Sequence, residues 1–309
     1  MHDHSIHHVH QVWDRAIAPV AEVEPGTELS FHVRDASDEQ LGPGSTADDV
    51  ATLDFGRVNP VCGPIFVKGA QPGDALEIEI LAFDARDWGW TAIIPGFGLL
   101  ADEFDEPWLR ISRVDAERRA VVFSDRITLP YEPFPGTIGV APPEPGPHSI
   151  VPPSRWGGNM DIKHLRAGTT LLLPVGVEGA LFSVGDTHSA MGDAEVCGTA
   201  VETAMDVTLR LSLRKGLELP APQYRVPAGE LARTQQSAYH VCTGVAPDLM
   251  EATRQATRAL IDHLVAERGL DRQEAYALCS VAADLRIHEV VDAPNWMVGA
   301  FLPDDIFTG

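Results

Sequence analysis

The amino-acid sequence predicts an α+β fold in which β-structure dominates, with helices confined to the last third of the chain. Three observations favour this class. Short runs of alternating apolar and polar residues recur through the first two-thirds of the 309 residues. Turn signals such as Pro25-Gly26 and Pro72-Gly73 separate these runs, and only the last third shows helical periodicity. Strands at this spacing indicate a sandwich or barrel rather than parallel strands alternating with helices.

Three runs show the period of a strand most clearly. Residues 29–33, 76–80 and 207–214 each place apolar side chains at every second position and polar side chains between them. Because successive side chains of a strand point to opposite faces, each run predicts a half-buried strand.

Residues 130–158 are predicted to form a long loop, because they hold nine of the chain's 24 prolines. A long structureless stretch inside a compact protein is usually functional or a linker. This one leads into Gly157-Gly158-Asn159-Met160-Asp161, where paired glycines let the backbone approach a ligand and Asp161 offers a carboxylate. We therefore expect the loop to be functional.

The last third of the chain changes to a helical pattern. A helix is predicted from Pro247 to Arg268, with Gly269 as its stop signal. Asp271 and Glu274 form a capping pair for a second helix that continues to residue 283, and residues 285–291 predict a return strand.

The chain accordingly divides into three parts that interlock and can count as one domain. Residues 1–130 form a β-rich N-terminal part, and residues 131–220 hold the Pro-rich loop and a β-rich candidate metal site. Residues 221–309 form an α/β C-terminal part.

The chain carries 23 Lys and Arg against 45 Asp and Glu, a formal charge of −22 at pH 7. Nucleic acids and anionic lipids both attract basic surfaces, so we expect neither partner. The acidity fits a small neutral or cationic substrate, a bound divalent metal, or solubility alone. The sequence shows neither a run long enough for a membrane helix nor a secretory signal, which predicts a cytoplasmic location.

The four cysteines show no Cys-x-x-Cys pairing, which excludes a zinc ribbon and favours buried thiols over disulfides. Cys62 and Cys197 lie in polar, Gly-rich surroundings, so a cysteine nucleophile is kept as an alternative. No G-x-S-x-G elbow, Walker loop, G-x-G-x-x-G or H-E-x-x-H motif is present.

The densest polar cluster follows an apolar run at residues 181–184. Asp186 and His188 stand two residues apart, so in extended chain they project to the same side, and Asp193 and Glu195 repeat this spacing after a short turn. Imidazole with carboxylates suits zinc, whereas carboxylates alone suit calcium or magnesium. The alternative is a generic turn whose side chains satisfy backbone N–H groups.

Three further residues are candidates, each with a structural alternative. The Asn59 amide could bind a carbonyl oxygen of a substrate, or it could stabilise a buried turn at Asn59-Pro60-Val61-Cys62-Gly63-Pro64. Asp35 follows the strand through Val33 and is either a turn residue or a metal ligand. Ser189 is poorly placed as a nucleophile activated by His188, because adjacent strand residues point to opposite faces.

These motifs resemble the acetamidase/formamidase family over nearly the whole length of the chain. Ordered blocks carry the resemblance: Arg57-Val58-Asn59-Pro60 with Gly63-Pro64, Gly69-Ala70-Gln71-Pro72-Gly73-Asp74, Ile138-Gly139-Val140-Ala141-Pro142, Gly157-Gly158-Asn159-Met160-Asp161, Gly179-Ala180-Leu181-Phe182, Gly185-Asp186-Thr187-His188, Met191-Gly192-Asp193-Ala194-Glu195 and Val201-Glu202.

The resemblance implies hydrolysis of a short carboxamide to a carboxylate and ammonia, with divalent metal, most favourably zinc and otherwise calcium, in the active site. It also implies a β-sandwich and barrel core with a helix-containing C-terminal α/β portion, assembled as a homo-oligomer (a dimer or higher). The residues that it draws into the site are Asp161, Asp186, His188, Asp193, Glu195, Asp35, Asn59 and Glu144.

Two positions depart from the family pattern. Trp156 stands directly before Gly157-Gly158, where many members have His, and Ala194 stands where Gly is usual. An indole cannot replace imidazole as a ligand or proton carrier. We expect Trp156 to form a wall of the substrate pocket with Asn159 nearby; the alternative is ordinary packing.

Together these observations predict a metal-dependent hydrolase of a small linear amide. In this hypothesis Asp161, Asp186 and His188 hold the ion, with Asp35 as a further candidate ligand, and Glu195 or Glu144 moves the proton. Asp193 and Asn59 are the other candidate catalytic residues. The alternatives are a non-catalytic metal-binding β-sandwich that binds a small molecule, and a hydrolase of another non-peptide C–N substrate.

Overall fold

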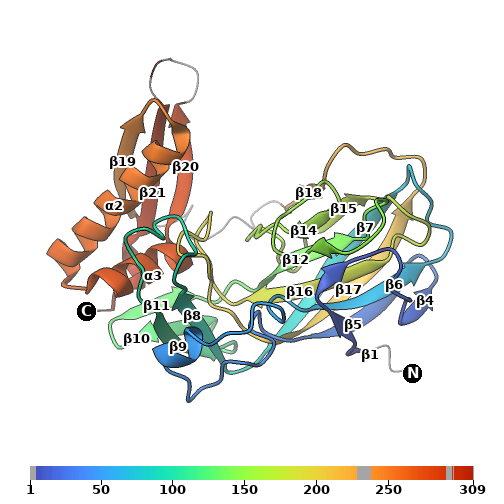
Figure 1. Cartoon of the computed structure of the whole chain (residues 1–309), viewed down its shortest axis with the longest axis horizontal. Coiled ribbons are helices and arrows are strands. Elements are labelled where there is room, and N and C mark those ends of the chain that lie inside the picture. Colours follow the sequence, from blue (N-terminus) through green and yellow to red (C-terminus); the bar gives the residue numbers. More distant parts are fainter. Residues whose placement is uncertain (1–4, 228–237, 290–293, 295, 309) are drawn as a thin grey trace.

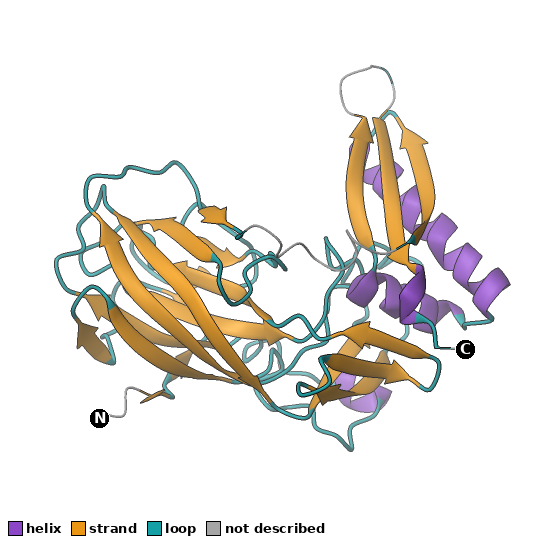
Figure 2. Cartoon of the chain, turned by 180° about the vertical axis from the view of Figure 1, so that it is seen from behind, coloured by secondary structure: helices purple, strands orange, loops and turns teal. Residues whose placement is uncertain are grey.

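The computed structural model describes residues 5–227, 238–289, 294 and 296–308. Two sheets form a sandwich in one half of the molecule, and a separate α/β unit rises at the other end (Figure 1). The view from behind shows the long strands of the sandwich crossing that half of the molecule (Figure 2).

The two sheets of the sandwich have six strands each, and in the second sheet one of the six lies off the main path. In the first, the order is β1 (Ser5–Ile6), β5 (Thr27–Val33), β17 (Met205–Arg214), β7 (Ala75–Ala85), β15 (Thr170–Pro174) and β18 (Gln223–Arg225). In the second, which also pairs β4 (Ala21–Val23) with β6, the path runs through β14 (Gly157–Asn159), β12 (Phe134–Val140), β16 (Phe182–His188), β6 (Val61–Val67) and β2 (Val9–His10). Phe31 of β5 packs edge-on against Phe182 of β16 in the core between them, with ring centroids 5.7 Å apart.

A smaller sheet lies beside the sandwich and carries its own core. Its order is β11 (Ile127–Pro130), β10 (Ala120–Ser124), β9 (Trp108–Asp115) and β8 (Trp88–Ile93). The segment from residue 36 to residue 53, which includes the short helix α1 (Ala47–Val50), packs against this sheet. We call this group the small core; its buried members are Ala36, Leu41, Val50, Trp90, Ala92 and Ile94. A two-stranded ladder joins β13 (His148–Ser149) to β3 (Val12–Trp13).

The C-terminal unit packs two helices on a three-stranded sheet. The strands are β19 (Tyr239–Ala246), β21 (Trp296–Pro303) and β20 (Asp284–Glu289), and the 3-10 helix η2 (Asp304–Ile306) follows β21. Helix α2 (Leu249–Arg268) begins with the Asp248 carboxylate accepting from the Glu251 amide and ends at Gly269 in the left-handed conformation. Helix α3 (Arg272–Ala282) begins with the Asp271 carboxylate accepting from the Glu274 amide.

The structure confirms the β-dominated α+β class, the strands expected at residues 29–33, 76–80 and 207–214, and the two C-terminal helices. The return strand β20 is present to Glu289, and the last two residues of the predicted strand lie outside the described part. Within the described residues the sheets remain open and do not close into a barrel. The described chain holds no helix with the length and apolarity needed to cross a membrane.

The prediction of a loop through residues 130–158 is wrong for its first part. Residues 134–140 form β12, every residue of which is buried between β14 and β16. A strand that is buried on both faces shows no alternation of apolar and polar residues. The sequence pattern therefore gave no strand signal, and Pro135 further obscured it.

A buried ion pair joins the C-terminal unit to the second sheet of the sandwich. Lys163 Nζ pairs with Asp284 at the start of β20, and both side chains are almost fully buried. Asp284 also accepts from the Asp193 backbone amide at 3.1 Å and from Arg286 at 3.2 Å. Lys163 therefore connects the segment after β14 to both β20 and the loop that contains Asp193.

We expect Lys163→Met to lower the free energy of unfolding by about 3 kcal/mol, because removing one partner leaves a buried charge with less compensation. The value lies at the low end of such losses since Arg286 still pairs with Asp284. The control is Lys68→Met, which breaks the surface pair between Lys68 and Glu24 and should change stability little. Urea denaturation of the three proteins measures the difference; equal stability of the two variants would contradict the prediction.

Candidate active site

The site is built on the paired strands β12 and β16. Asp186 and His188 both belong to β16, and His188 stands at its end, opposite Phe134 of β12. The expected closeness of residues two apart is present, since His188 Nε2 lies 3.2 Å from Asp186 Oδ1. Phe134 packs edge-on against the imidazole at a centroid distance of 5.0 Å and restricts the orientation of the ring.

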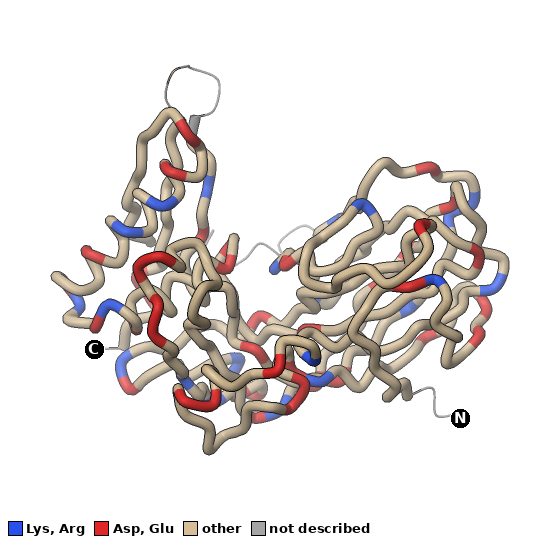
Figure 3. Tube along the Cα trace, viewed as in Figure 1, with Lys and Arg blue, Asp and Glu red and all other residues tan. Residues whose placement is uncertain are grey.

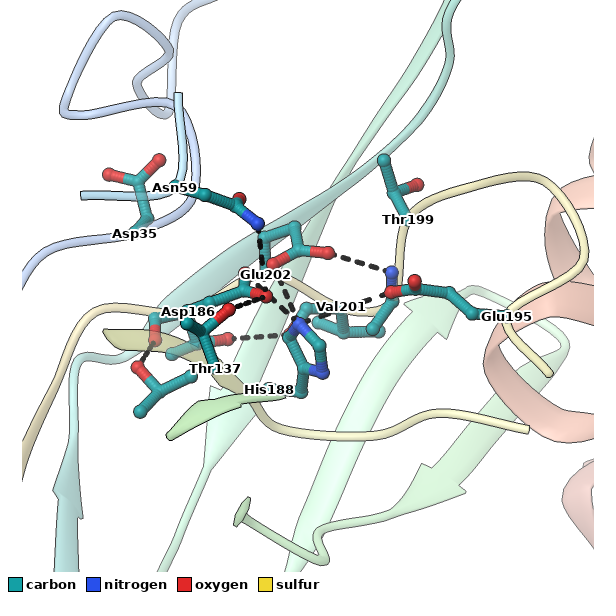
Figure 4. A network of polar contacts seen from close by, with 12 residues as sticks. Asp35, Asn59, Thr137, Asp186, His188, Glu195, Thr199, Val201 and Glu202 are labelled. Carbon is teal, nitrogen blue, oxygen red and sulfur yellow. Dashed lines mark hydrogen bonds and ion pairs between the residues drawn. The ribbon is translucent and has the colours of Figure 1, made fainter. Parts of the chain in front are cut away.

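His188 Nε2 points into a ring of carboxyl groups (Figure 4). Besides Asp186, it lies 3.1 Å from Glu202 Oε2 and 3.9 Å from Glu195 Oε1. Two groups of possible ligand atoms result, each lying within 4.8 Å: Asp161, Asp186 and His188 form one, and His188, Glu195 and Glu202 form the other. The structure thus brings together four carboxyl groups around a single imidazole.

Sequence reasoning missed Glu202 as a site residue, although Val201-Glu202 was among the family motifs. Glu202 forms isolated bridges with both Trp90 and His188, so its position depends on pairings between distant segments. One of its carboxyl oxygens accepts from the Ala200 amide at 2.8 Å, and the other faces His188. In the sequence, Glu202 was indicated only by the Val201-Glu202 block that resembles the family.

The pKa values of the four carboxyl groups are shifted from those of ordinary surface acids. Burial raises the pKa of Glu202 to about 7, and burial together with the neighbouring Asp186 raises the pKa of Asp161 to about 7. Burial and the charge of Asp161 raise the pKa of Glu195 well above its usual range. Burial opposes ionisation of Asp186 as well, but the adjacent His188 outweighs it and lowers the pKa of that carboxyl.

The pKa of the His188 imidazole depends on the same carboxyl groups. Burial disfavours a charged His188, but Glu202 and Asp186 overcome this effect and raise the pKa of the ring well above its ordinary value. The pKa shifts of the carboxyl groups and of the imidazole therefore arise from the same buried contacts.

Backbone strain gathers at the same place. Asn59, Asp161, Asp186 and Glu195 all have left-handed φ values, of 51°, 48°, 53° and 45°. Such conformations cost about 1–3 kcal/mol each and persist where the surrounding structure enforces them, often at functional sites. Ala194 also has a positive φ, of 84°, which explains why glycine suits this position in the family.

Three carboxyl groups of the cluster line a cavity of about 170 Å³, and we call its polar lining the floor. The floor consists of Asp186, Glu195 and Glu202 with the amides of Asn59 and Asn159. Asn59 Nδ2 donates to Asp186 Oδ2 at 3.4 Å, and Asn159 Oδ1 accepts from the Thr137 hydroxyl at 2.7 Å. The two predicted amide contacts thus border the same cavity as the carboxylates.

Asp35, predicted as a possible ligand, has a different environment. Its Oδ1 accepts from the Trp90 indole at 2.9 Å and from the backbone amide of Ser37 at 2.9 Å, and its Oδ2 accepts from the Glu39 amide at 3.2 Å. Both oxygens are therefore engaged in organising a turn, and Asp35 belongs to neither group of possible ligands.

Asp193 and Glu144 also lie apart from the cluster. The expectation that Asp193 and Glu195 occupy an extended segment is wrong, because residues 193–194 form a turn and Glu195 has a left-handed φ. The two side chains diverge as a result, and Asp193 lies 3.6 Å from Lys163. Glu144 lines a separate depression in the Pro-rich loop.

Trp156 faces the same separate depression and is not among the residues that line the cavity above the cluster. Its ring packs closely over Gly176, where an added Cβ would lie 2.9 Å from the indole, and the Arg155 guanidinium lies 4.6 Å from the ring centroid. This placement supports the alternative reading of Trp156 as a packing residue.

The alternative nucleophiles have inert surroundings. Burial raises the pKa of the Cys62 thiol to about 12 and that of the Cys197 thiol to about 11, so neither forms a thiolate readily near neutral pH. The buried Ser189 hydroxyl donates to Thr203 Oγ1 at 2.9 Å. As expected for neighbours on a strand, it points away from the imidazole of His188.

The cluster has the donor set that a divalent cation requires. Asp161 Oδ1 is buried without a hydrogen-bond partner, and Glu202 Oε2 has only the His188 imidazole beside it, at 3.1 Å. Buried polar atoms are rarely left in this state, and buried carboxylates normally pair with cations or coordinate metal. One imidazole with several carboxylates is a combination found at zinc sites. The residues present therefore fit a divalent ion.

Gly136 provides a test of this geometry. A Cβ at this position would lie 2.5 Å from Asp161 Oδ1, 2.6 Å from His188 Cε1 and 2.8 Å from Asp186 Oδ2. We expect Gly136→Ala to displace these three side chains and to lower amide hydrolysis at least a hundredfold, a loss of about 2.7 kcal/mol in transition-state stabilisation. The matched control is Gly44→Ala, whose Cβ meets nothing within 4 Å. Wild-type activity of Gly136→Ala would contradict the described packing.

Known proteins match this chain over nearly its whole length. The sequence profile of the Acetamidase/Formamidase family matches residues 1–150 and 146–309. A formamidase from Methylophilus methylotrophus is 26% identical over 375 residues, covering 97% of this chain and 89% of the relative.

Two solved structures extend the comparison. A gamma lactamase from Delftia acidovorans superposes with a TM-score of 0.89 at 28% identity, covering 97% of this chain and 90% of that one. An acetamidase from Bacillus halodurans superposes with a TM-score of 0.68 at 32% identity, covering 97% of each chain. The chain therefore belongs to the acetamidase/formamidase family, which confirms the resemblance seen in its sequence and the predicted enzyme class, a hydrolase of the C–N bonds of linear amides.

Proposed function

We propose that this chain hydrolyses a small neutral carboxamide to a carboxylate and ammonia with the help of a bound divalent metal ion. The observation that carries the proposal is the ring of buried carboxyl groups around His188 on the floor of a small cavity. Family membership supports the reaction, and the grouping of possible ligand atoms around the unpartnered Asp161 Oδ1 supports the metal.

Asp161, Asp186 and His188 would hold the ion, with Glu202 beside them. We favour zinc, with calcium as the other choice, because the donor set includes an imidazole. A bound ion of this kind would lower the pKa of a water molecule to about 7 and would polarise a carbonyl oxygen. Both effects are needed, since an amide carbonyl is a poor electrophile.

The remaining residues of the cavity supply positioning and proton transfer. Glu195 borders the cavity with a carboxyl oxygen near His188, so it is the proposed proton carrier to the departing nitrogen. Glu144 and Asp193, the other predicted candidates, lie outside this cavity. The Asn59 amide is an N–H donor on the floor and would orient the carbonyl oxygen of the substrate.

A second candidate is hydrolysis of a cyclic amide, which sequence analysis kept as another C–N substrate. The TM-score of 0.89 with the gamma lactamase, against 0.68 with the acetamidase, favours it. A non-catalytic binding protein, the other alternative, has no such support, because the chain matches an amidase family over its length.

The cytoplasmic location, the homo-oligomer and the division into three parts stay predictions.

Removing the metal should abolish activity. We expect dialysis against a strong chelator to stop ammonia release from acetamide, and zinc or another divalent ion to restore it. Metal content, measured in the same samples, should follow activity. Full activity in protein shown to contain no metal would exclude the metal-dependent mechanism while leaving the amidase class intact.

His188→Ala and Asp161→Ala should each lower kcat/KM roughly thousandfold, since each removes a proposed ligand and with it the activation of water and carbonyl. Ser189→Ala is the control, a neighbouring buried residue whose hydroxyl bonds only within the fold. It should keep most of its activity. A loss in Ser189→Ala as large as in His188→Ala would point instead to a serine nucleophile.

A further inference from the structure

The cavity above the cluster has two chemically different faces. The floor carries the carboxyl groups and the two amides described above. The same cavity is also lined by apolar side chains, which are Leu53, Phe55, Val58, Trp90, Ile94, Phe97 and Val151. We call these seven residues the apolar wall.

The polar atoms next to the apolar wall already have partners within the protein. The Trp90 indole N–H donates to Asp35 at 2.9 Å, and the Ser37 hydroxyl donates to the same carboxylate. The Thr199 hydroxyl donates to the Ala92 carbonyl at 2.8 Å and accepts from its amide at 3.0 Å. A substrate group placed against this wall therefore meets hydrocarbon and no free donor.

Asp35 gains a role from this arrangement. Its carboxylate accepts from the Trp90 indole and from the Ser37 hydroxyl, and both residues line the cavity. Asp35 therefore satisfies polar atoms that would otherwise be open to the substrate.

The apolar wall belongs to a different part of the fold from the floor. Trp90 and Ile94 are buried members of the small core, and Leu53 packs against that core. Phe55, Phe97 and Val151 stand at the surface and are 58%, 43% and 42% exposed. Large apolar side chains at the edge of a cavity gain free energy when a ligand covers them.

The size of the cavity limits the substrate. An apolar cavity of about 150 Å³ holds benzene, a molecule of six carbon atoms. The cavity of about 170 Å³ therefore accommodates about six non-hydrogen atoms. An amide group uses three of these, which leaves room for about three further carbons against the wall.

We propose that the apolar wall selects amides whose acyl part is a compact hydrocarbon, branched as in isobutyramide or closed as in a five-membered lactam, over formamide. This inference rests on the proposed function and specifies its substrate class. The carboxamide lies on the floor beside Asn59 and Glu195, and the hydrocarbon lies against Leu53 and Phe97.

The test compares kcat/KM for formamide, acetamide, isobutyramide and 2-pyrrolidinone in wild type, Leu53→Ala and Phe97→Ala. Product is measured as ammonia or, for the lactam, as the ring-opened amino acid. Each buried carbon contributes about fourfold. We expect each variant to lower the ratio of isobutyramide to formamide by at least fourfold, with formamide itself changed less than twofold. Tyr224→Ala is the matched control, since Tyr224 is also 43% exposed but does not line this cavity.

A second measurement separates this inference from the proposed function. Ligand-induced shifts of Tm are recorded with formamide and isobutyramide for the same proteins. If no amide is hydrolysed but isobutyramide stabilises wild type more than the two wall variants, the proposed function fails and the apolar wall stands as a binding surface. An unchanged ratio, or an equal loss for every amide with no difference in Tm shifts, overturns the inference.

Discussion

The structure depends on a concentration of acidic side chains in a buried place. Asp161, Asp186, Glu195 and Glu202 surround one imidazole, and the most buried of them have little access to water. Four ionised carboxylates in this environment would repel one another strongly. A divalent ion bound among them would relieve this repulsion. The chain's overall excess of acidic residues, spread along its whole length (Figure 3), adds to the attraction for cations.

Such a cluster requires a rigid support, and the second sheet of the sandwich supplies it. Strand β12 is buried throughout, and β16 lies between β12 and β6. The surrounding ladder holds Asp186 in a left-handed conformation that an isolated strand would avoid. Gly136 leaves the space into which Asp161, Asp186 and His188 fit. Strain and close packing at the site are thus compensated by the hydrogen bonds and apolar contacts of the sandwich.

The sequence predicted what local periodicity determines. Asp186 and His188 were found because two residues on one strand share a face, and both C-terminal helices were found through their caps. Glu202 was missed because its approach to His188 depends on bridges with distant segments. Asp35 was predicted as a ligand and Asp193 as a catalytic residue because local spacing does not reveal competing partners. These partners are Trp90 for Asp35 and Lys163 for Asp193. The sequence also did not reveal that Trp156 packs over Gly176 and faces a depression separate from the cavity.

The ion pair between Lys163 and Asp284 has a consequence for the order of events in biosynthesis. Asp284 holds the backbone of Asp193, two residues before Glu195, yet it is contributed by a strand near the end of the chain. A nascent polypeptide that has not yet emerged from the ribosome beyond this strand lacks the partner that fixes the Glu195 loop. The loop that carries Glu195 is therefore fixed only once the C-terminal unit is present.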